Sequence, residues 1–173
     1  MSSQRSFARV STFINGRLRR LASGRDRALF HGSSPALTFS PQKLAEAHLP
    51  EPLLEFLLSL DNKLDTLLSL ASRPTMEQDF PTAIQVMEIS ASGLSFISPE
   101  QFSPGQRVET VLTLSQSPLR MASALGEVMR VKVENGERRN ILEFTSIRDR
   151  DRESIVQFVF QEERSQIRQA KWS

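Results

Sequence analysis

The sequence of 173 residues contains no cysteine and no tyrosine, and only two histidines, His31 and His48. Without cysteine the chain forms no disulfide, offers no thiolate to a metal ion and has no cysteine nucleophile. Two histidines are also too few for a typical histidine-based metal site. No Gly-rich phosphate loop is present. These absences predict a protein that is not an enzyme and that uses neither a metal nor a cofactor.

Long apolar runs are also missing. No stretch approaches the roughly 18 apolar residues that a membrane-spanning helix needs. The N-terminal residues are charged and include no apolar segment of the kind found in signal peptides. We therefore expect a cytoplasmic chain without a transmembrane segment, of a length that suits one domain with an appendage.

Charge is unevenly distributed along the chain. Residues 1–30 contain seven arginines and one acidic residue, Asp26, which is a formal charge of +6 in a chain whose net charge is +2. Arginine binds phosphate oxygens with a planar fork, so this segment favours a phosphate-bearing partner, unless it is a solvated arm. The later strands are not basic, and one tryptophan with no tyrosine offers little base stacking, which argues against nucleic acid.

A leucine-rich segment between Pro52 and Pro74 gives the clearest helical pattern. Its leucines recur at alternating steps of four and three residues, at Leu53, Leu57, Leu60, Leu64 and Leu67. Pro52 suits the first turn of a helix, where its missing N–H needs no partner. Further apolar residues flank this stripe, so the helix must be buried on most sides. It is either a central core helix of the domain or a self-association helix in a bundle of more than two chains.

Strand patterns dominate the second half of the chain. We expect strands over residues 84–89, 94–97, 108–115, 125–133 and 141–145, with turns at Pro104-Gly105 and Asn135-Gly136. Such spacing predicts a small antiparallel barrel or sandwich. Residues 149–171 then read as an amphipathic helix with acidic residues at its start.

The first half of the chain carries weaker signals. Val10 to Ile14 predicts a short strand that ends in a tight turn at Asn15-Gly16. Ser40-Pro41 predicts the start of a short helix, because serine is a good cap and proline fits the first turn. Residues 73–82, which include two prolines, are expected to form a linker.

Two motifs in this sequence resemble the signatures of the PilZ domain. Arg5-Ser-Phe-Ala-Arg9 matches the family's RxxxR, and the run from Glu88 to Gly93 matches its [D/N]xSxxG, except that Glu88 stands where the family has Asp or Asn. PilZ domains are six-stranded antiparallel barrels that act in bacteria as receptors for the second messenger cyclic di-GMP. The resemblance therefore implies a mainly β fold with added helices (α+β) and a regulatory function.

The resemblance also implies an organisation for the whole chain. It suggests a single domain over residues 1–173, with an arginine-rich arm and first strand, an inserted helical region, the barrel strands and a closing helix (1–21, 40–73, 83–147 and 149–171). Between Arg9 and Glu88 lie 78 residues, far more than in a typical member. This insertion is similar to that of the atypical PilZ branch, in which a heptad helix assembles four chains and cyclic di-GMP binding is often lost. We expect a homo-oligomer, most simply a tetramer.

The ligand site that the resemblance implies consists of Arg5, Arg9, Glu88, Ser90 and Gly93. Arginine can pair with guanine O6 and N7, while a carboxylate accepts from guanine N–H groups. Ser90 adds a hydroxyl, and Gly93 permits a positive φ or a close approach of the ligand. The alternative is that residues 90–93 form a turn and the arginines a solvated tail. We expect a cyclic di-GMP effector with an unidentified protein partner in motility, surface or virulence behaviour, or else an oligomeric scaffold that binds no nucleotide.

Overall fold

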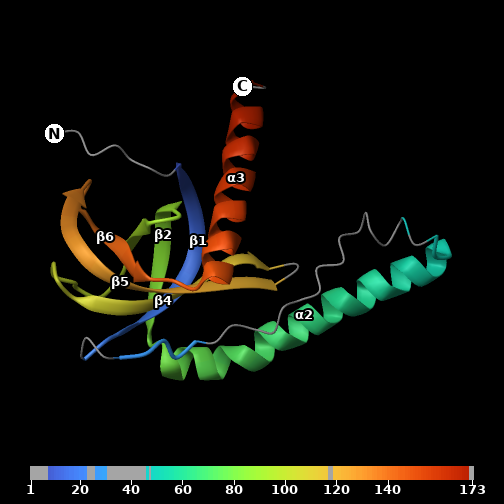
Figure 1. Ribbon diagram of the computed structural model, residues 1–173, viewed down its shortest axis with the longest axis horizontal. Coiled ribbons are helices and arrows are strands. Elements are labelled where there is room, and N and C mark those ends of the chain that lie inside the picture. Colours follow the sequence, from blue (N-terminus) through green and yellow to red (C-terminus); the bar gives the residue numbers. More distant parts are fainter. Residues whose placement is uncertain (1–7, 23–25, 31–45, 47, 117–118, 172–173) are drawn as a thin grey trace.

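The computed structural model describes residues 8–22, 26–30, 46, 48–116 and 119–171. Within these residues, six antiparallel strands close into a barrel that carries two helices (Figure 1). In chain order the elements are β1 (Arg9–Arg20), α2 (Glu51–Asp79), β2 (Thr82–Ser90), β3 (Gly93–Ile97), β4 (Arg107–Gln116), β5 (Leu119–Glu134), β6 (Glu137–Ser146) and α3 (Asp149–Lys171). The predicted six-stranded antiparallel barrel with a C-terminal helix is confirmed. The short helix expected from Ser40 falls almost entirely outside the described residues.

The strands follow the order β1-β2-β3-β6-β5-β4, and β4 pairs with β1 to close the barrel. Alternate side chains of each strand point inward, as the two-residue period of a strand requires, and form one hydrophobic core. Phe96 and Phe102 meet edge to face inside it, with their ring centroids 5.4 Å apart. Helix α3 adds Ile155, Phe158 and Val159 to the same core, so it is an integral part of the domain.

Both turns predicted in the second half of the chain are present. Asn135 and Gly136 have φ angles of 52° and 79° and join β5 to β6, which is the backbone that a tight hairpin with right-handed twist requires. Gly105 has a φ of 88° in the connection that leads into β4. Glycine is favoured at such positive φ angles because it has no Cβ.

The turn predicted at Asn15-Gly16 is wrong, because β1 continues through both residues to Arg20. Gly16 pairs with Ile84 on one side and Leu112 on the other. A Cβ on Gly16 would lie 3.0 Å from the carbonyl oxygen of Val111, so the missing side chain lets the two strands approach. Packing between strands therefore accounts for this glycine.

Helix α2 is longer than predicted. It begins as expected after Pro50, with Pro52 in its first turn, but it continues past Pro74 to Asp79. The linker predicted over residues 73–82 is therefore wrong. A proline inside a helix removes one hydrogen bond, at a cost of about 3 kcal/mol. The contacts of the barrel with the end of α2, described below, help to offset that cost.

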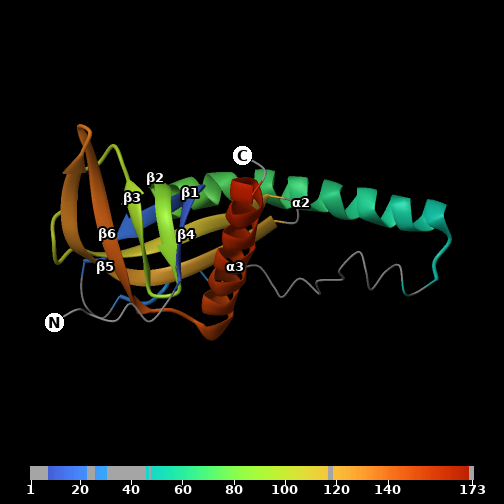
Figure 2. The ribbon, with the colours of Figure 1, turned by 90° about the horizontal axis from the view of Figure 1, so that it is seen from above.

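The leucine stripe of α2 is open to solvent in the single chain. Leu53, Leu60, Leu64 and Leu67 have exposed fractions between 43% and 60%, and Leu57 is half-buried. Figures 1 and 2 show that most of α2 extends beyond the barrel. The interpretation of α2 as a central core helix is therefore wrong. Neither described helix has the combination of length and apolarity that crossing a membrane requires.

Candidate functional site

The predicted site residues that the structure describes gather at one end of the β1–β2–β3 sheet. Arg9 begins β1 and pairs with Ser90, near the end of β2, while Gly93 begins β3 and pairs with Ser90 from the other side. Glu88 lies two residues before Ser90 and pairs with Ser11 of β1. Arg5 lies outside the described residues, so the second arginine of the motif is not placed. The barrel thus brings Arg9, Glu88, Ser90 and Gly93 together.

Arg9 and Glu88 form an ion pair between the two strands. Nη1 of Arg9 lies 3.8 Å from Oε2 of Glu88, and the two side chains are 38% and 31% exposed. An ion pair this long and this exposed contributes little to stability. The Glu88 carboxylate also accepts a hydrogen bond of 3.3 Å from the Ser95 hydroxyl. Both charged groups therefore remain reachable and weakly held, as a ligand site needs.

A register irregularity sets the direction of Glu88. The pairing between β2 and β3 shifts between Val86 and Glu88. Such irregularities add a residue to one strand and turn the following side chain. Glu88 is consequently half-buried beside Arg9, whereas Val86 and Ile89 point into the core.

Ser90 is buried, and its hydroxyl already has partners. It donates to the carbonyl oxygen of Gly93 at 3.2 Å and lies 3.3 Å from the hydroxyl of Ser92. The backbone N–H of Ser92 donates to it at 3.4 Å. These contacts stabilise the β2–β3 turn, as serine commonly does. The structure thus gives Ser90 a role in shaping the hairpin that carries Glu88.

Gly93 is required by close packing between strands. A Cβ at this position would lie 2.3 Å from the carbonyl oxygen of Leu142 in β6, which no side chain tolerates. Gly93 lies in a regular strand and is not among the glycines with positive φ in the described residues. Of the two roles considered for Gly93, the positive φ is therefore not observed, and the close approach of a ligand stays a prediction. The glycine of the motif serves the approach of β3 to β6.

Besides Arg9, three arginines of the basic N-terminal segment lie in β1 and contact other parts of the structure. Arg17 binds the end of α2, Arg19 pairs with Glu109, and Arg20 pairs with Glu100 and lies over the ring of Phe102. Sequence reasoning missed this because it ended the strand at Ile14 and placed a turn at Asn15-Gly16. The alternation of Arg17, Leu18 and Arg19 is the signal that could have revealed a longer strand.

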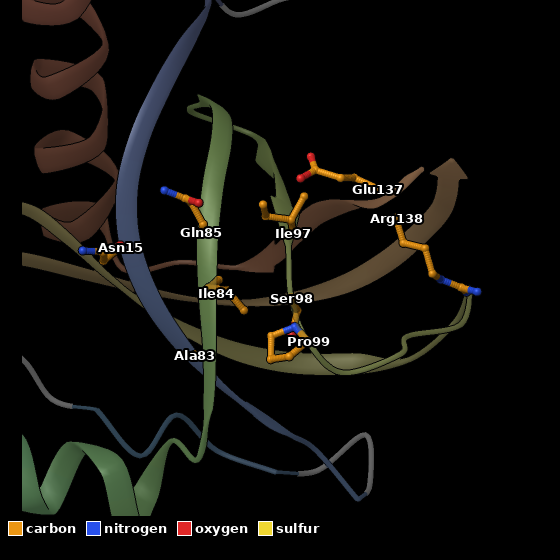
Figure 3. A pocket seen from close by; sticks show the side chains of 9 residues that line it. All are labelled: Asn15, Ala83, Ile84, Gln85, Ile97, Ser98, Pro99, Glu137 and Arg138. Atoms are coloured by element: carbon orange, nitrogen blue, oxygen red, sulfur yellow. The ribbon is translucent and has the colours of Figure 1, made fainter. Parts of the chain in front are cut away.

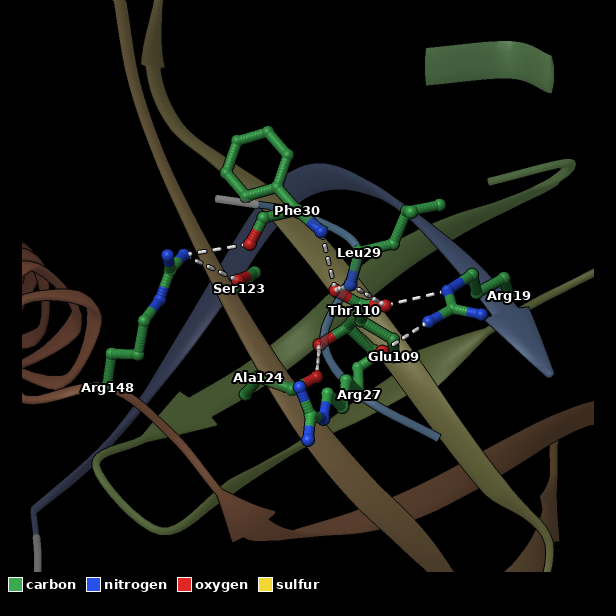
Figure 4. A network of polar contacts seen from close by, with 9 residues as sticks. All are labelled: Arg19, Arg27, Leu29, Phe30, Glu109, Thr110, Ser123, Ala124 and Arg148. Carbon is green, nitrogen blue, oxygen red and sulfur yellow. Dashed lines mark hydrogen bonds and ion pairs between the residues drawn. The ribbon is translucent and has the colours of Figure 1, made fainter. Parts of the chain in front are cut away.

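Glu109 of β4 is the centre of a buried polar network (Figure 4). The side chain is fully buried, and it accepts hydrogen bonds from Nε of Arg19 at 2.7 Å and from the backbone N–H groups of Leu29 and Phe30 at 2.9 Å. Four donor–acceptor contacts of this kind satisfy a charge that would otherwise be costly to bury. This network fixes residues 26–30 against the barrel.

Two hollows lie farther along the sheet, away from Arg9 and Glu88. The larger, of about 470 Å³, is bordered by Gln85 of β2, Ile97 of β3 and Glu137 of β6 (Figure 3). The smaller, of about 310 Å³, lies where Met76 and Glu77 of α2 meet the barrel. Among the described residues no group of acidic or histidine side chains is arranged to hold a metal ion.

Three comparisons place these features among known proteins. The family model for the PilZ domain matches residues 72–161, which is just over half of the chain. This span includes five of the six strands and most of α3 but excludes β1. No curated protein sequence matches the chain.

Solved structures share the fold at low sequence identity. The tetrameric PilZ domain protein of Xanthomonas campestris, described as self-assembled through a helical bundle, is 19% identical, with 94% of this chain and 92% of that chain covered and a TM-score of 0.56. The inhibitor of motility MotI (DgrA) of Bacillus subtilis is 11% identical, with a TM-score of 0.54. The match covers 95% of this chain, which spans about half of the Bacillus protein (53%).

The PilZ domain of YcgR from Escherichia coli, solved with cyclic di-GMP, is 9% identical, with 98% of both chains covered and a TM-score of 0.51. At these identities the similarity establishes the architecture alone. The family itself follows from the match over residues 72–161, which agrees with the barrel and with the motif from Glu88 to Gly93. The chain belongs to the PilZ domain family.

Proposed function

We propose that this protein is a cytoplasmic, non-enzymatic PilZ regulator that binds cyclic di-GMP, assembles through α2 and acts through protein partners on motility, surface or virulence behaviour. The observation that supports ligand binding most directly is the weakly held pair of Arg9 and Glu88 on neighbouring strands. A guanidinium and a carboxylate this close together offer guanine both of the groups that its edge requires.

The proposed roles follow from the chemistry of each side chain. Arg9, together with Arg5, donates charge-assisted hydrogen bonds to phosphate or to guanine O6 and N7. Glu88 accepts from the guanine N–H groups. Ser90 and Gly93 hold the hairpin that presents Glu88, through the bonds of the Ser90 hydroxyl and the close packing at Gly93. The cyclic di-GMP found with the YcgR domain, which shares this fold, supports the choice of ligand.

Assembly through α2 is proposed from the exposed leucine stripe. A row of exposed leucines on one helix is an apolar surface of the kind that marks protein interaction sites. We propose that the stripe packs against the same stripe of further copies, most simply in a tetramer. The Xanthomonas campestris PilZ protein, whose own tetramer forms through a helical bundle, supports this number.

A second candidate function is an oligomeric PilZ scaffold that binds protein partners and no nucleotide. Two observations favour it. The Ser90 hydroxyl is already occupied within the hairpin, and Arg9 and Glu88 neutralise each other. In addition, Glu88 replaces the shorter Asp or Asn of the family motif.

Calorimetric titration with cyclic di-GMP separates the two functions. Saturable binding to the wild-type chain supports the receptor, and absence of binding supports the scaffold. Cyclic di-AMP is the matched control ligand, since it carries the same two phosphates but lacks the O6 acceptor and the N2 donor of guanine. Equal binding of both ligands would mean that the chain attracts only phosphate, which contradicts the proposed guanine site.

A further inference from the structure

The segment that carries α2 leaves the barrel after β1 and returns to it at β2, and charged side chains hold it at both ends. At the return, Arg17 of β1 donates from Nε to the carbonyl oxygen of Phe80 at 2.7 Å and from Nη2 to that of Pro81 at 3.0 Å. Its Nη1 lies 3.8 Å from the carboxylate of Glu77. The guanidinium therefore contacts Glu77 in the last turn of α2 and the two residues that follow the helix, through all three of its nitrogens.

This arrangement suits the chemistry of a helix end. The last carbonyl groups of a helix lack partners within the helix and carry partial negative charge, so a cation placed there is favourable. Helix α2 has no basic residue of its own in its last turn. Arg17 supplies that charge from β1. The ring of Phe80, the residue that follows α2, is buried and anchors this end of the helix to the domain.

Where the chain leaves the barrel after β1, residues 26–30 are held by the Glu109 network. The Glu109 carboxylate holds the backbone N–H groups of Leu29 and Phe30, and Arg148 donates to the carbonyl oxygen of Phe30 at 3.0 Å (Figure 4). Arg19 orients the Glu109 carboxylate through its own bond of 2.7 Å and also donates to the carbonyl oxygen of Arg27 at 2.8 Å. This end is thus tied to β1 and β4 by charge-assisted bonds.

The two attachments share one strand. Arg17 and Arg19 lie two residues apart on β1, so their side chains leave the same face of the sheet. Arg17 reaches the returning end of the segment and Arg19 the departing end. The rest of α2 extends away from the barrel (Figures 1 and 2).

We infer that Arg17 is a positioning residue that fixes the direction of α2 relative to the barrel, so that the two move as one body, whereas Arg19 acts through Glu109 on residues 26–30. In the assembly proposed above, on which this consequence rests, Arg17 sets how each barrel is oriented around the helical bundle. A regulator built in this way presents its barrels at defined angles to a protein partner.

The test measures the distance between α2 and the barrel directly. The chain has no cysteine, so Glu55→Cys on the outer side of α2 and Lys132→Cys on β5 give two specific positions for spin labels. Double electron–electron resonance is recorded on the full chain, with labelled protein diluted into excess unlabelled protein so that distances within one chain dominate. Light scattering on the same samples gives the mass of the assembly.

We expect one narrow distance in the wild-type background. Arg17→Met, which approximates the length of the side chain but removes its donors, should replace this peak with a broad distribution. Arg130→Met is the matched control, because Arg130 is exposed on β5 and contacts neither end of the segment. It should leave the peak unchanged. Circular dichroism confirms that each variant is folded.

Two outcomes would overturn the inference: a broad distribution in the wild-type background, or an equally narrow peak in Arg17→Met. If Arg17→Met does not fold, Arg17→Lys decides, since lysine is a point donor that cannot bind Phe80, Pro81 and Glu77 together and should broaden the peak. Light scattering gives the mass of the assembly independently of the distance between the two labels. A monomer with a narrow peak would refute the proposed assembly and leave the positioning role intact.

Discussion

Arg9 on β1 lies 3.8 Å from Glu88 on β2, and each side chain is about one-third exposed. This ion pair affects ligand binding in two ways. It gathers the two groups that guanine recognition needs, and it lets each neutralise the other until a ligand separates them. Because an exposed pair of this length is weak, a ligand that offers each group a charge-assisted hydrogen bond competes with it readily.

Removal of the arginine should weaken ligand binding selectively. A hydrogen bond to a charged group contributes roughly 1.5–3 kcal/mol, so Arg9→Ala should lower affinity for cyclic di-GMP by about tenfold or more. Calorimetry measures the change. Arg130→Ala is the control, since it removes the same charge from another strand. Equal losses in the two variants would show that only net charge matters.

Shortening the carboxylate should preserve or improve binding. Glu88→Asp restores the residue of the family motif and draws the carboxylate back from Arg9, which weakens the pair that competes with the ligand. We expect affinity for cyclic di-GMP equal to or tighter than that of the wild type, whereas Glu88→Ala should lose the acceptor and bind more weakly. Weaker binding by Glu88→Asp than by Glu88→Ala would contradict a direct contact between this carboxylate and the ligand.

Gly93 provides a test of which motif residues act through the fold. Gly93→Ala places a Cβ against the carbonyl oxygen of Leu142, and backbone in a paired strand cannot move away. Overpacking of this kind costs about 1–3 kcal/mol, so we expect a lower midpoint of urea unfolding. A Gly93→Ala variant with wild-type stability and no ligand binding would instead assign the glycine to the ligand.

The buried network around Glu109 should be important for stability. Glu109→Ala leaves the Arg19 guanidinium and two backbone N–H groups without their acceptor, which should lower the free energy of unfolding by on the order of 3 kcal/mol. Chemical denaturation at one fixed protein concentration measures it. Glu137→Ala, a change at an exposed glutamate of β6, should cost far less. Similar losses in both variants would argue against the network.

Charges placed in the leucine stripe should dissociate the assembly. Leu60→Asp combined with Leu64→Asp would bury carboxylates between apolar partners, which is strongly unfavourable. The control combines Ser59→Asp with Lys63→Asp, the preceding residues in the sequence, which are exposed and off the stripe. Light scattering at micromolar concentration should show a lower mass only for the leucine variant. A wild-type monomer would refute the proposed assembly.

The barrel was predictable because its strands follow local rules. The alternation of apolar residues from Ile84 onward and the Asn135-Gly136 turn located five strands, β2, β3 and β4 closely, whereas β5 and β6 begin six and four residues earlier than predicted. The acidic start and apolar period predicted the bounds of α3. The errors have a common cause in long-range contacts. Gly16 suits a strand position because Val111 of β4 passes close to it. Helix α2 continues beyond Pro74 to an end where Arg17 of β1 contacts Glu77 and Phe80.

The candidate site shows the same division between local and distant information. Its motif identified the end of the β2–β3 hairpin, and the barrel places Arg9 beside Glu88. The actual partners of Ser90 and Gly93 depend on the turn and on β6, which adjacent sequence does not specify. The network between Glu109, Arg19 and residues 29–30 joins positions 79 to 90 residues apart, and no motif in the sequence marks it.

Closure of the barrel restricts how copies of this chain can meet. Strand β4 pairs with β1 over Gly16–Arg20, so no strand of the described sheet is left with an entire edge unpaired. A strand from a second copy could add only to the shorter stretches outside this pairing, such as Arg9–Asn15 of β1, which pairs with β2 alone. The exposed leucine face of α2 therefore carries the proposed association of the whole protein.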